Sequence, residues 1–149
     1  MTFGKFEIPG KFIGRNEAER LARSHWSKAN EVKRDETQTA MLYARQSGIG
    51  PVDGPVDVCV AFREMVSLDA DGNLKRPRDA DNVMAGCKPV LDGMVKAGIF
   101  QDDGPKWVRR VIPVVRYVLD GPRITVAVMP YEPARVVTYP PVDLPGEEF

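Results

Sequence analysis

Apolar and polar residues alternate in two stretches near the start and the middle of the chain, which is the pattern of short β-strands. The first covers residues 3–8 and ends at Pro9-Gly10. The second covers residues 56–62, where valine recurs at every other position before Phe62. We expect a strand in each stretch, and the second is the clearer of the two because β-branched residues favour strands. A turn follows the second strand at residues 69–72.

That turn superficially resembles the start of a calcium-binding loop, because its sequence is Asp69-Ala70-Asp71-Gly72. A calcium loop of the EF-hand type needs glycine at its sixth position and glutamate at its twelfth. Those positions hold Leu74 and Ala80 here. We therefore predict a hairpin turn and no calcium site.

Two further strands are predicted at residues 107–119 and 124–129, which are rich in valine and isoleucine. Asp120-Gly121 between them favours a tight turn, so we expect a closing β-hairpin. Pro113 lies inside the first of these stretches and cannot donate a backbone hydrogen bond, which places that strand at a sheet edge or at a bulge.

Helices are predicted at residues 16–47 and 81–96. The first stretch contains no glycine or proline, begins at Asn16 as a candidate N-cap and stops at Gly48, and it forms either two helices or one interrupted helix. The second ends before Gly98. Pro89 interrupts its pattern, so we expect a kink between Gly86 and Pro89, or a restart with Pro89 in a first turn.

The order and length of these elements predict an α+β fold in one domain. A chain of 149 residues with 43% hydrophobic content builds one ordinary core. We assign residues 1–130 to this domain, with a small mixed or antiparallel sheet packed against helices. Residues 131–149 contain Pro133, Pro140, Pro141 and Pro145 and are predicted to form an extended arm or tail.

No stretch approaches the roughly 20 apolar residues that span a bilayer, so we expect no membrane partner and a cytoplasmic location. The two cysteines, Cys59 and Cys87, lack the paired spacing of a zinc site and are too few for a disulfide framework. Buried free thiols are the expected state of both.

Positive charge gathers in one region although the formal net charge is zero. That balance argues against a protein that binds nucleic acid only by being basic. Between residues 10 and 34 basic side chains outnumber acidic ones, with Lys11, Arg15, Arg20, Arg23, Lys28, Lys33 and Arg34 against Glu17, Glu19 and Glu31. We expect this imbalance to give a local basic face.

Acidic residues gather around Asp79 and Asp81. If the chain is still extended there, both side chains project from one face and can grip one cation. Mg²⁺ takes oxygen ligands and is usually held by one or two carboxylates plus substrate phosphates. The alternative is that both acids only stabilise a helix N-terminus, and that Asp102-Asp103 is an ordinary polar turn.

In order along the chain, Arg78-Asp79-Ala80-Asp81-Asn82, Lys88-Pro89-Val90-Leu91-Asp92-Gly93-Met94 and Ala97-Gly98-Ile99-Phe100-Gln101-Asp102-Asp103 form an ordered set of short motifs. This set resembles the RusA family of Holliday-junction resolvases, which are metal-dependent endodeoxyribonucleases of phages and prophages. Ile8-Pro9-Gly10-Lys11, Asn16 and the basic run through Lys28, Asn30 and Lys33 also look like the N-terminal region of that family. The resemblance covers most of the chain.

The resemblance implies a RusA-like fold and a homodimer that makes paired cuts in a four-way DNA junction. It implies that Asp79, Asp81 and Asp103 are catalytic carboxylates that bind Mg²⁺, with Mn²⁺ as an alternative, and that Lys88 is the catalytic-site lysine. The residues that we expect to contact DNA are Arg15, Asn16, Lys28, Lys33, Lys75, Arg76 and Arg78.

The spacing of the lysine departs from the family pattern. The better-known members have the lysine four residues after the second acid, whereas Lys88 follows Asp81 by seven. Three extra helical residues rotate a side chain by about 300° and shift it by about 4.5 Å, which returns it near the same face one turn along. Two other interpretations remain open: a catalytically impaired protein that still binds junctions, and a nuclease for other branched DNA.

Overall fold

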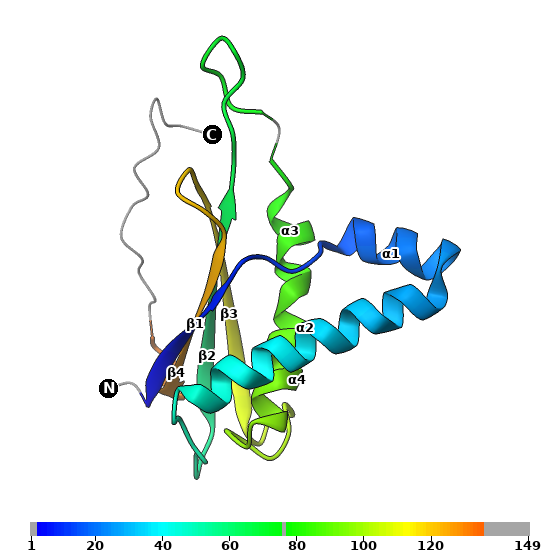
Figure 1. The fold of residues 1–149 in the computed structure, drawn as a ribbon. Coiled ribbons are helices and arrows are strands. Elements are labelled where there is room, and N and C mark those ends of the chain that lie inside the picture. The colour runs from blue at the N-terminus through cyan, green and yellow to red at the C-terminus, as the bar shows by residue number, and fades with distance from the viewer. Residues whose placement is uncertain (1–2, 76, 136–149) are drawn as a thin grey trace.

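The computed structural model describes residues 3–75 and 77–135. Its elements, in chain order, are β1 (Gly4–Pro9), α1 (Arg15–Ser24), α2 (Trp26–Gln46), β2 (Val56–Met65), α3 (Ala80–Val83), the 3₁₀ turn η1 (Met84–Gly86), α4 (Cys87–Lys96), β3 (Val108–Val118) and β4 (Arg123–Pro130). Figure 1 shows the strands in one layer and the helices together on one side of it.

The strands form one four-stranded sheet in the order β1-β4-β2-β3. β4 pairs antiparallel with both β1 and β2, whereas β3 runs parallel to β2. A parallel pair needs a long crossover connection, and α3, η1 and α4 provide it between β2 and β3. The expectation of an α+β domain with a small mixed sheet is therefore confirmed.

The predicted hairpin between the last two strands is wrong. β3 and β4 are consecutive in the chain, but β2 lies between them and pairs with both. The turn at Asp120-Gly121 reverses the chain as expected, but it connects β3 to β4 across the end of β2. The reason is burial: β2 is the most buried strand and is enclosed when both neighbours cover its edges. Pro113 lies in β3 at the sheet edge, as predicted.

β2 is buried on both faces, although its sequence alternates between apolar and polar residues. Val56, Val58 and Val60 join the main core, which the helices cover. On the other face Cys59 and Asp57 are also enclosed. The alternating pattern predicts the strand correctly but does not predict that its second face is also buried.

The long helical region divides at His25 into α1 and α2, one of the two expected arrangements. Asn16 is not the N-cap. α1 begins at Arg15, and Gly14 is its N-cap. The backbone N–H of Asn16 donates to Oδ1 of Asn82 at 2.9 Å. A distant side chain therefore takes over the role that the sequence assigns to a local one.

The second helical region is broken as predicted. α3 is one turn long, η1 follows, and α4 starts at Cys87 with Pro89 in its first turn, where the missing N–H costs nothing. Gly98 follows α4 with φ of +83°, a left-handed conformation that glycine adopts without strain. The break means that the acids of α3 and the lysine of α4 do not share one continuous helix.

The turn after β2 is the predicted hairpin turn. Leu68 and Leu74 form an isolated antiparallel bridge, and Oδ1 of Asp69 accepts hydrogen bonds from the N–H groups of Asp71 and Asn73 at 2.9 Å each. The carboxylate of Asp69 is thus engaged with its own turn, as in other Asx turns.

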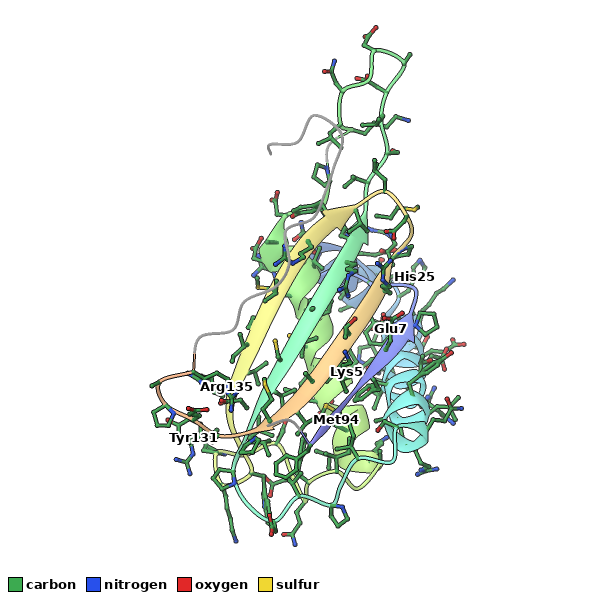
Figure 2. The ribbon with its side chains drawn as sticks, turned by 90° about the vertical axis from the view of Figure 1, so that its left-hand side faces the viewer. Lys5, Glu7, His25, Met94, Tyr131 and Arg135 are labelled. Carbon is green, nitrogen blue, oxygen red and sulfur yellow. The ribbon has the colours of Figure 1, made fainter. Side chains whose placement is uncertain are left out.

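The residues after β4 remain attached to the sheet. Arg135 and Arg110 both donate to the buried carboxylate of Asp57, and the N–H of Tyr131 donates to the carbonyl of Pro55. Burial by itself raises the pKa of Asp57, but the hydrogen bonds from Arg110 and Arg135 hold this pKa below its usual value. Figure 2, which looks onto the sheet face opposite the helices, shows Tyr131 and Arg135 at one end of the sheet.

The predicted arm therefore begins with a segment, residues 131–135, that is held against the domain, and residues 136–149 lie outside the described part. Within the described ranges, no helix has the length and apolar character needed to cross a membrane. Both cysteines are free thiols as expected, but only Cys59 is fully buried. Burial raises the pKa of the half-buried Cys87 to about 11.

Candidate functional site

Lys88 connects the start of α4 with the loop that follows it. Its ammonium nitrogen lies 3.0 Å from Oδ1 of Asp92 and 3.4 Å from Oδ2 of Asp103. The hydrogen bond to Asp92, and then the negative charge of both carboxylates, raises the pKa of Lys88. The structure therefore places together two predicted site residues that are separated by fifteen positions in the sequence.

The loop that carries Asp103 is fixed on both sides. Ile99 and Phe100 are buried in the core before it, and Val108 begins β3 after it. Within the loop, Oδ1 of Asp102 accepts the N–H of Gly104 at 2.7 Å. Asp102 therefore stabilises the turn, as expected if Asp102-Asp103 is an ordinary polar turn. The neighbouring carboxylate of Asp103 remains exposed and faces Lys88.

Asp79 and Asp81 lie at the junction between an extended segment and α3. Asp79 is extended, with φ of −64° and ψ of 149°, and it occupies the N-cap position without a side-chain capping bond. Ala80 is already helical, so the condition under which both acids share one strand face is not met. Asp81 is exposed and pairs with Nη2 of Arg15 at 3.1 Å. Both carboxylates are thus accessible at the surface.

A buried ion pair holds the chain just before Asp79. Nε and Nη2 of Arg78 donate to the two carboxylate oxygens of Glu64 at 2.8 and 2.7 Å, and Nη1 donates to the carbonyl of Phe12 at 3.2 Å. The Tyr117 hydroxyl donates to the Arg78 carbonyl at 2.8 Å. These contacts tie the segment that carries Asp79 to β2, β3 and the N-terminal loop. We call this set the Arg78 clamp.

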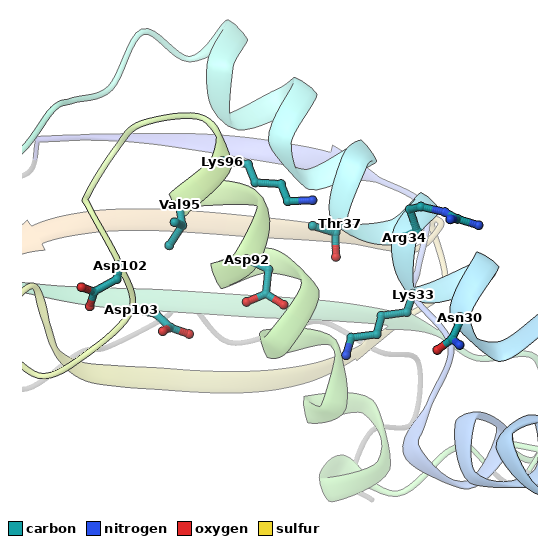
Figure 3. A pocket seen from close by; sticks show the side chains of 9 residues that line it. All are labelled: Asn30, Lys33, Arg34, Thr37, Asp92, Val95, Lys96, Asp102 and Asp103. Carbon is teal, nitrogen blue, oxygen red and sulfur yellow. The ribbon is translucent and has the colours of Figure 1, made fainter. Parts of the chain in front are cut away.

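An opening of about 380 Å³ is lined by residues of α2, α4 and the Asp103 loop. Figure 3 shows the carboxylates of Asp92 and Asp103 facing this opening, while Lys33 extends from α2 toward α4. Arg34 and Lys96 add further positive charge to its lining. Lysines and carboxylates therefore converge on one polar depression beside Lys88.

Six of the seven predicted DNA-contacting residues lie in the described ranges, and they form three groups. Lys28, Lys33 and Lys75 are exposed, and Lys33 lines the opening. Arg15 and Arg78 already pair with Asp81 and Glu64, so the Arg78 guanidinium is committed within the fold. Asn16 is bound to Asn82 through its backbone, with its side chain exposed. Arg76 lies outside the described residues.

The donor chemistry of the three predicted metal ligands suits a hard divalent cation, since all three are carboxylates. At Lys88, the ammonium group lies against one oxygen of Asp92 and one of Asp103. Across the described ranges, however, no three acidic, histidine or cysteine side chains form a ready-made metal-binding group.

Sequence reasoning assigned no role to three residues that shape the site. Asp92 is four residues after Lys88, a spacing at which helical side chains meet, so that contact was detectable. Glu64 gave a weaker signal, because it lies two residues beyond the stretch predicted as a strand. Asn82 gave none, because its bond to the start of α1 spans 66 positions.

Comparison of the chain with models of known protein families gives no match, and comparison with curated protein sequences gives none either.

Proposed function

We propose that the protein is a metal-dependent endodeoxyribonuclease that resolves four-way DNA junctions, as the resemblance to the RusA family implies. The observation that carries the proposal is the meeting of Lys88 with Asp103 and Asp92 beside an opening lined by three basic and three acidic side chains. Phosphodiester hydrolysis needs a cation at the scissile phosphate and carboxylates near the attacking water. These groups are adjacent here.

Asp79, Asp81 and Asp103 are the residues that would hold Mg²⁺ or Mn²⁺. An ion held there would lower the pKa of a coordinated water and would stabilise negative charge on the phosphate. The carboxylates of Asp81 and Asp103 presently face Arg15 and Lys88, and both pairs are exposed. Exposed ion pairs of this kind contribute less than about 1 kcal/mol to stability. Replacement of Arg15 or Lys88 by a metal ion as the partner of these carboxylates therefore costs little free energy.

The remaining residues have separate parts in this proposal. Lys88 donates to a non-bridging oxygen of the scissile phosphate and offsets its charge. Lys33 and Arg34 bind neighbouring phosphates along the opening, and phosphate contacts supply most of the affinity for DNA. The Arg78 clamp positions Asp79 without touching the substrate. A homodimer gives the paired cuts that resolution of a four-way junction requires.

A junction-binding protein without nuclease activity is the second candidate. The break at η1 favours it, because α3 and α4 are separate helices and Lys88 stands seven residues after Asp81. The absence of a ready-made group of three acids in the described ranges is compatible with it.

The test is cleavage of a synthetic four-way junction in Mg²⁺, in Mn²⁺ and in EDTA. A flap, a fork and a linear duplex serve as alternative substrates. We expect symmetric nicks in the junction that EDTA abolishes. Asp81→Asn should lose cleavage and keep binding, while Asp71→Asn, an exposed acid in the turn after β2, should keep both.

Binding without any metal-dependent cut would support the second candidate and refute the first. Cleavage of flaps in preference to junctions would assign the protein to other branched DNA. Full activity of a folded Asp81→Asn variant would refute the assignment of the metal ligands.

A further inference from the structure

A second cavity, of about 300 Å³, lies between the α1–α2 pair and the start of α4. Its walls are mostly small apolar side chains from α1, α2, η1 and α4, and a few polar groups lie among them. The lining consists of Ile13, Ala18, Ala22, Ala29, Asn30, Lys33, Glu36, Ala85, Lys88 and Pro89. Binding sites for small flat molecules have this composition, with mostly apolar walls and few polar groups that set orientation.

α1, which forms one wall of the cavity, contacts α2 and α3 but is only lightly packed. None of its ten residues is buried, although Ala18 and Ala22 stand one turn apart on its inner side. A ten-residue helix is only marginally stable by itself in water and normally gains stability by covering apolar surface. Alanines at these positions leave space where larger side chains would fill it. This face is therefore suited to an inserted group.

Two lysines, Lys33 and Lys88, line the cavity where it adjoins the proposed nuclease site. Lys33 and Asn30 line both this cavity and the opening beside Asp103. Lys88 lines the cavity and contacts Asp103. A ligand with an apolar flat part and an attached phosphate fits this arrangement, because its phosphate meets the lysines while its flat part meets the alanines.

Two polar side chains inside the cavity have hydrogen-bonding capacity for a ligand. Oε2 of Glu36 accepts the N–H of Ile13 at 2.7 Å, which fixes the carboxyl group and leaves Oε1 for other partners. Asn30 is exposed, with an amide that both donates and accepts. Amide and carboxyl groups are suited to the edge of a nucleobase, where donors and acceptors alternate.

We propose that this cavity binds an unpaired nucleobase at the branch point of the DNA substrate. The proposal rests on the proposed function and adds a specific contact to it. The base lies between the alanines of α1 and α2 and Pro89 of α4, and its phosphate contacts Lys33. A base at a branch is already poorly stacked, so its extrusion costs less than in a duplex.

The test uses a four-way junction with 2-aminopurine at positions next to the crossover, mixed with the full-length protein in EDTA. Fluorescence of 2-aminopurine rises when the base leaves the stack. We expect a rise with the wild-type protein at a position next to the crossover, and no rise at a position well inside one arm. Ala29→Phe fills the cavity and should abolish the rise, while junction affinity, which phosphate contacts dominate, changes by less than about threefold.

Gln38→Phe is the matched control, because Gln38 is exposed on the same helix and is not part of either lining. It should behave as the wild type. Circular dichroism and thermal unfolding establish that both variants are folded, and Ala22→Phe provides an independent blocking variant. A full fluorescence rise with folded Ala29→Phe and Ala22→Phe would overturn the proposal.

The two proposals fail in different ways. Metal-dependent cleavage without any fluorescence rise would overturn the base-binding site and leave the nuclease intact. A rise that depends on Ala29, without cleavage in Mg²⁺ or Mn²⁺, would overturn the nuclease and support the base-binding site. Wild-type protein that binds no branched DNA would overturn both.

Discussion

Replacement of Arg78 by methionine should destabilise the protein strongly, because it leaves the buried carboxylate of Glu64 without its main partner. The Glu64 side chain is 5% exposed, and both of its oxygens accept hydrogen bonds from Arg78. Removal of one member of a buried ion pair costs about 3 to 5 kcal/mol. Lys11 remains 4.0 Å from Glu64, which places the expected loss near the lower end, about 3 kcal/mol.

A double-mutant cycle with Glu64→Gln separates the ion pair from other effects of the substitution. In the Glu64→Gln background no buried charge remains at this position, so loss of Arg78 should cost clearly less, about 1 kcal/mol. Chemical denaturation with urea gives the free energy of unfolding of all four proteins, and an unchanged dependence on denaturant shows that the folded states are comparable. Equal costs in both backgrounds, or a cost of Arg78→Met below about 1 kcal/mol, would refute this account of the clamp.

The same position provides a functional test of positioning. Arg78 precedes Asp79, and its guanidinium is engaged within the fold, so Arg78→Lys should bind junctions normally. Lysine cannot reproduce the two parallel hydrogen bonds to Glu64. We expect cleavage to fall by more than about tenfold in single-turnover assays, since a small displacement of a catalytic group is costly. Unchanged cleavage would show that Asp79 needs no clamp.

Three further predictions concern Glu36, Gly93 and Lys88. Burial, the largest cause, raises the pKa of Glu36 from 4.5 to about 7, so the folded protein holds a proton there that the unfolded chain releases. The resulting stability is complete below pH 4.5 and is lost as the pH rises to about 7. The expected loss in the free energy of unfolding is on the order of 1 kcal/mol after allowance for partial exposure. Urea denaturation should show this loss in the wild type but not in Glu36→Gln. A methyl group on Gly93 would lie 2.6 Å from Cβ of Ala40, so Gly93→Ala should lower the free energy of unfolding by about 1 to 3 kcal/mol in the same assay. Lys88→Met should change stability by less than about 0.5 kcal/mol, because the side chain is 61% exposed, while it reduces single-turnover cleavage by about a hundredfold or more.

Local patterns in the sequence predicted the elements of the fold but not their arrangement. The break before α4 was predictable because Pro89 removes a backbone donor, and the stop at Gly98 because glycine adopts a positive φ. The sheet order was not, since the turn at Asp120-Gly121 has the same local chemistry whether or not a third strand enters between its arms. Strand order is decided by burial of β2, which is a property of the whole chain.

The site shows the same division. The contact of Lys88 with Asp92 follows from helical spacing, and the resemblance of the motifs put Lys88 and Asp103 in one predicted set. The pairing of Arg78 with Glu64 was hidden, because a loop arginine beside acids has the same sequence pattern whether it binds phosphate or a buried carboxylate. Burial of Glu64 decides between these roles, and it depends on tertiary packing.

The ion pairs of the site fall into two energetic classes, and the difference assigns them separate tasks. Lys88–Asp103 and Arg15–Asp81 are exposed, so water and salt weaken them and each contributes at most about 1 kcal/mol. A phosphate or a divalent cation can replace either partner at little energetic cost. In the Arg78–Glu64 pair the carboxylate is buried, and loss of Arg78 leaves that carboxylate with little access to solvent. The exposed pairs are therefore suited to exchange during binding, whereas the buried pair keeps the backbone beside Asp79 in place throughout that exchange.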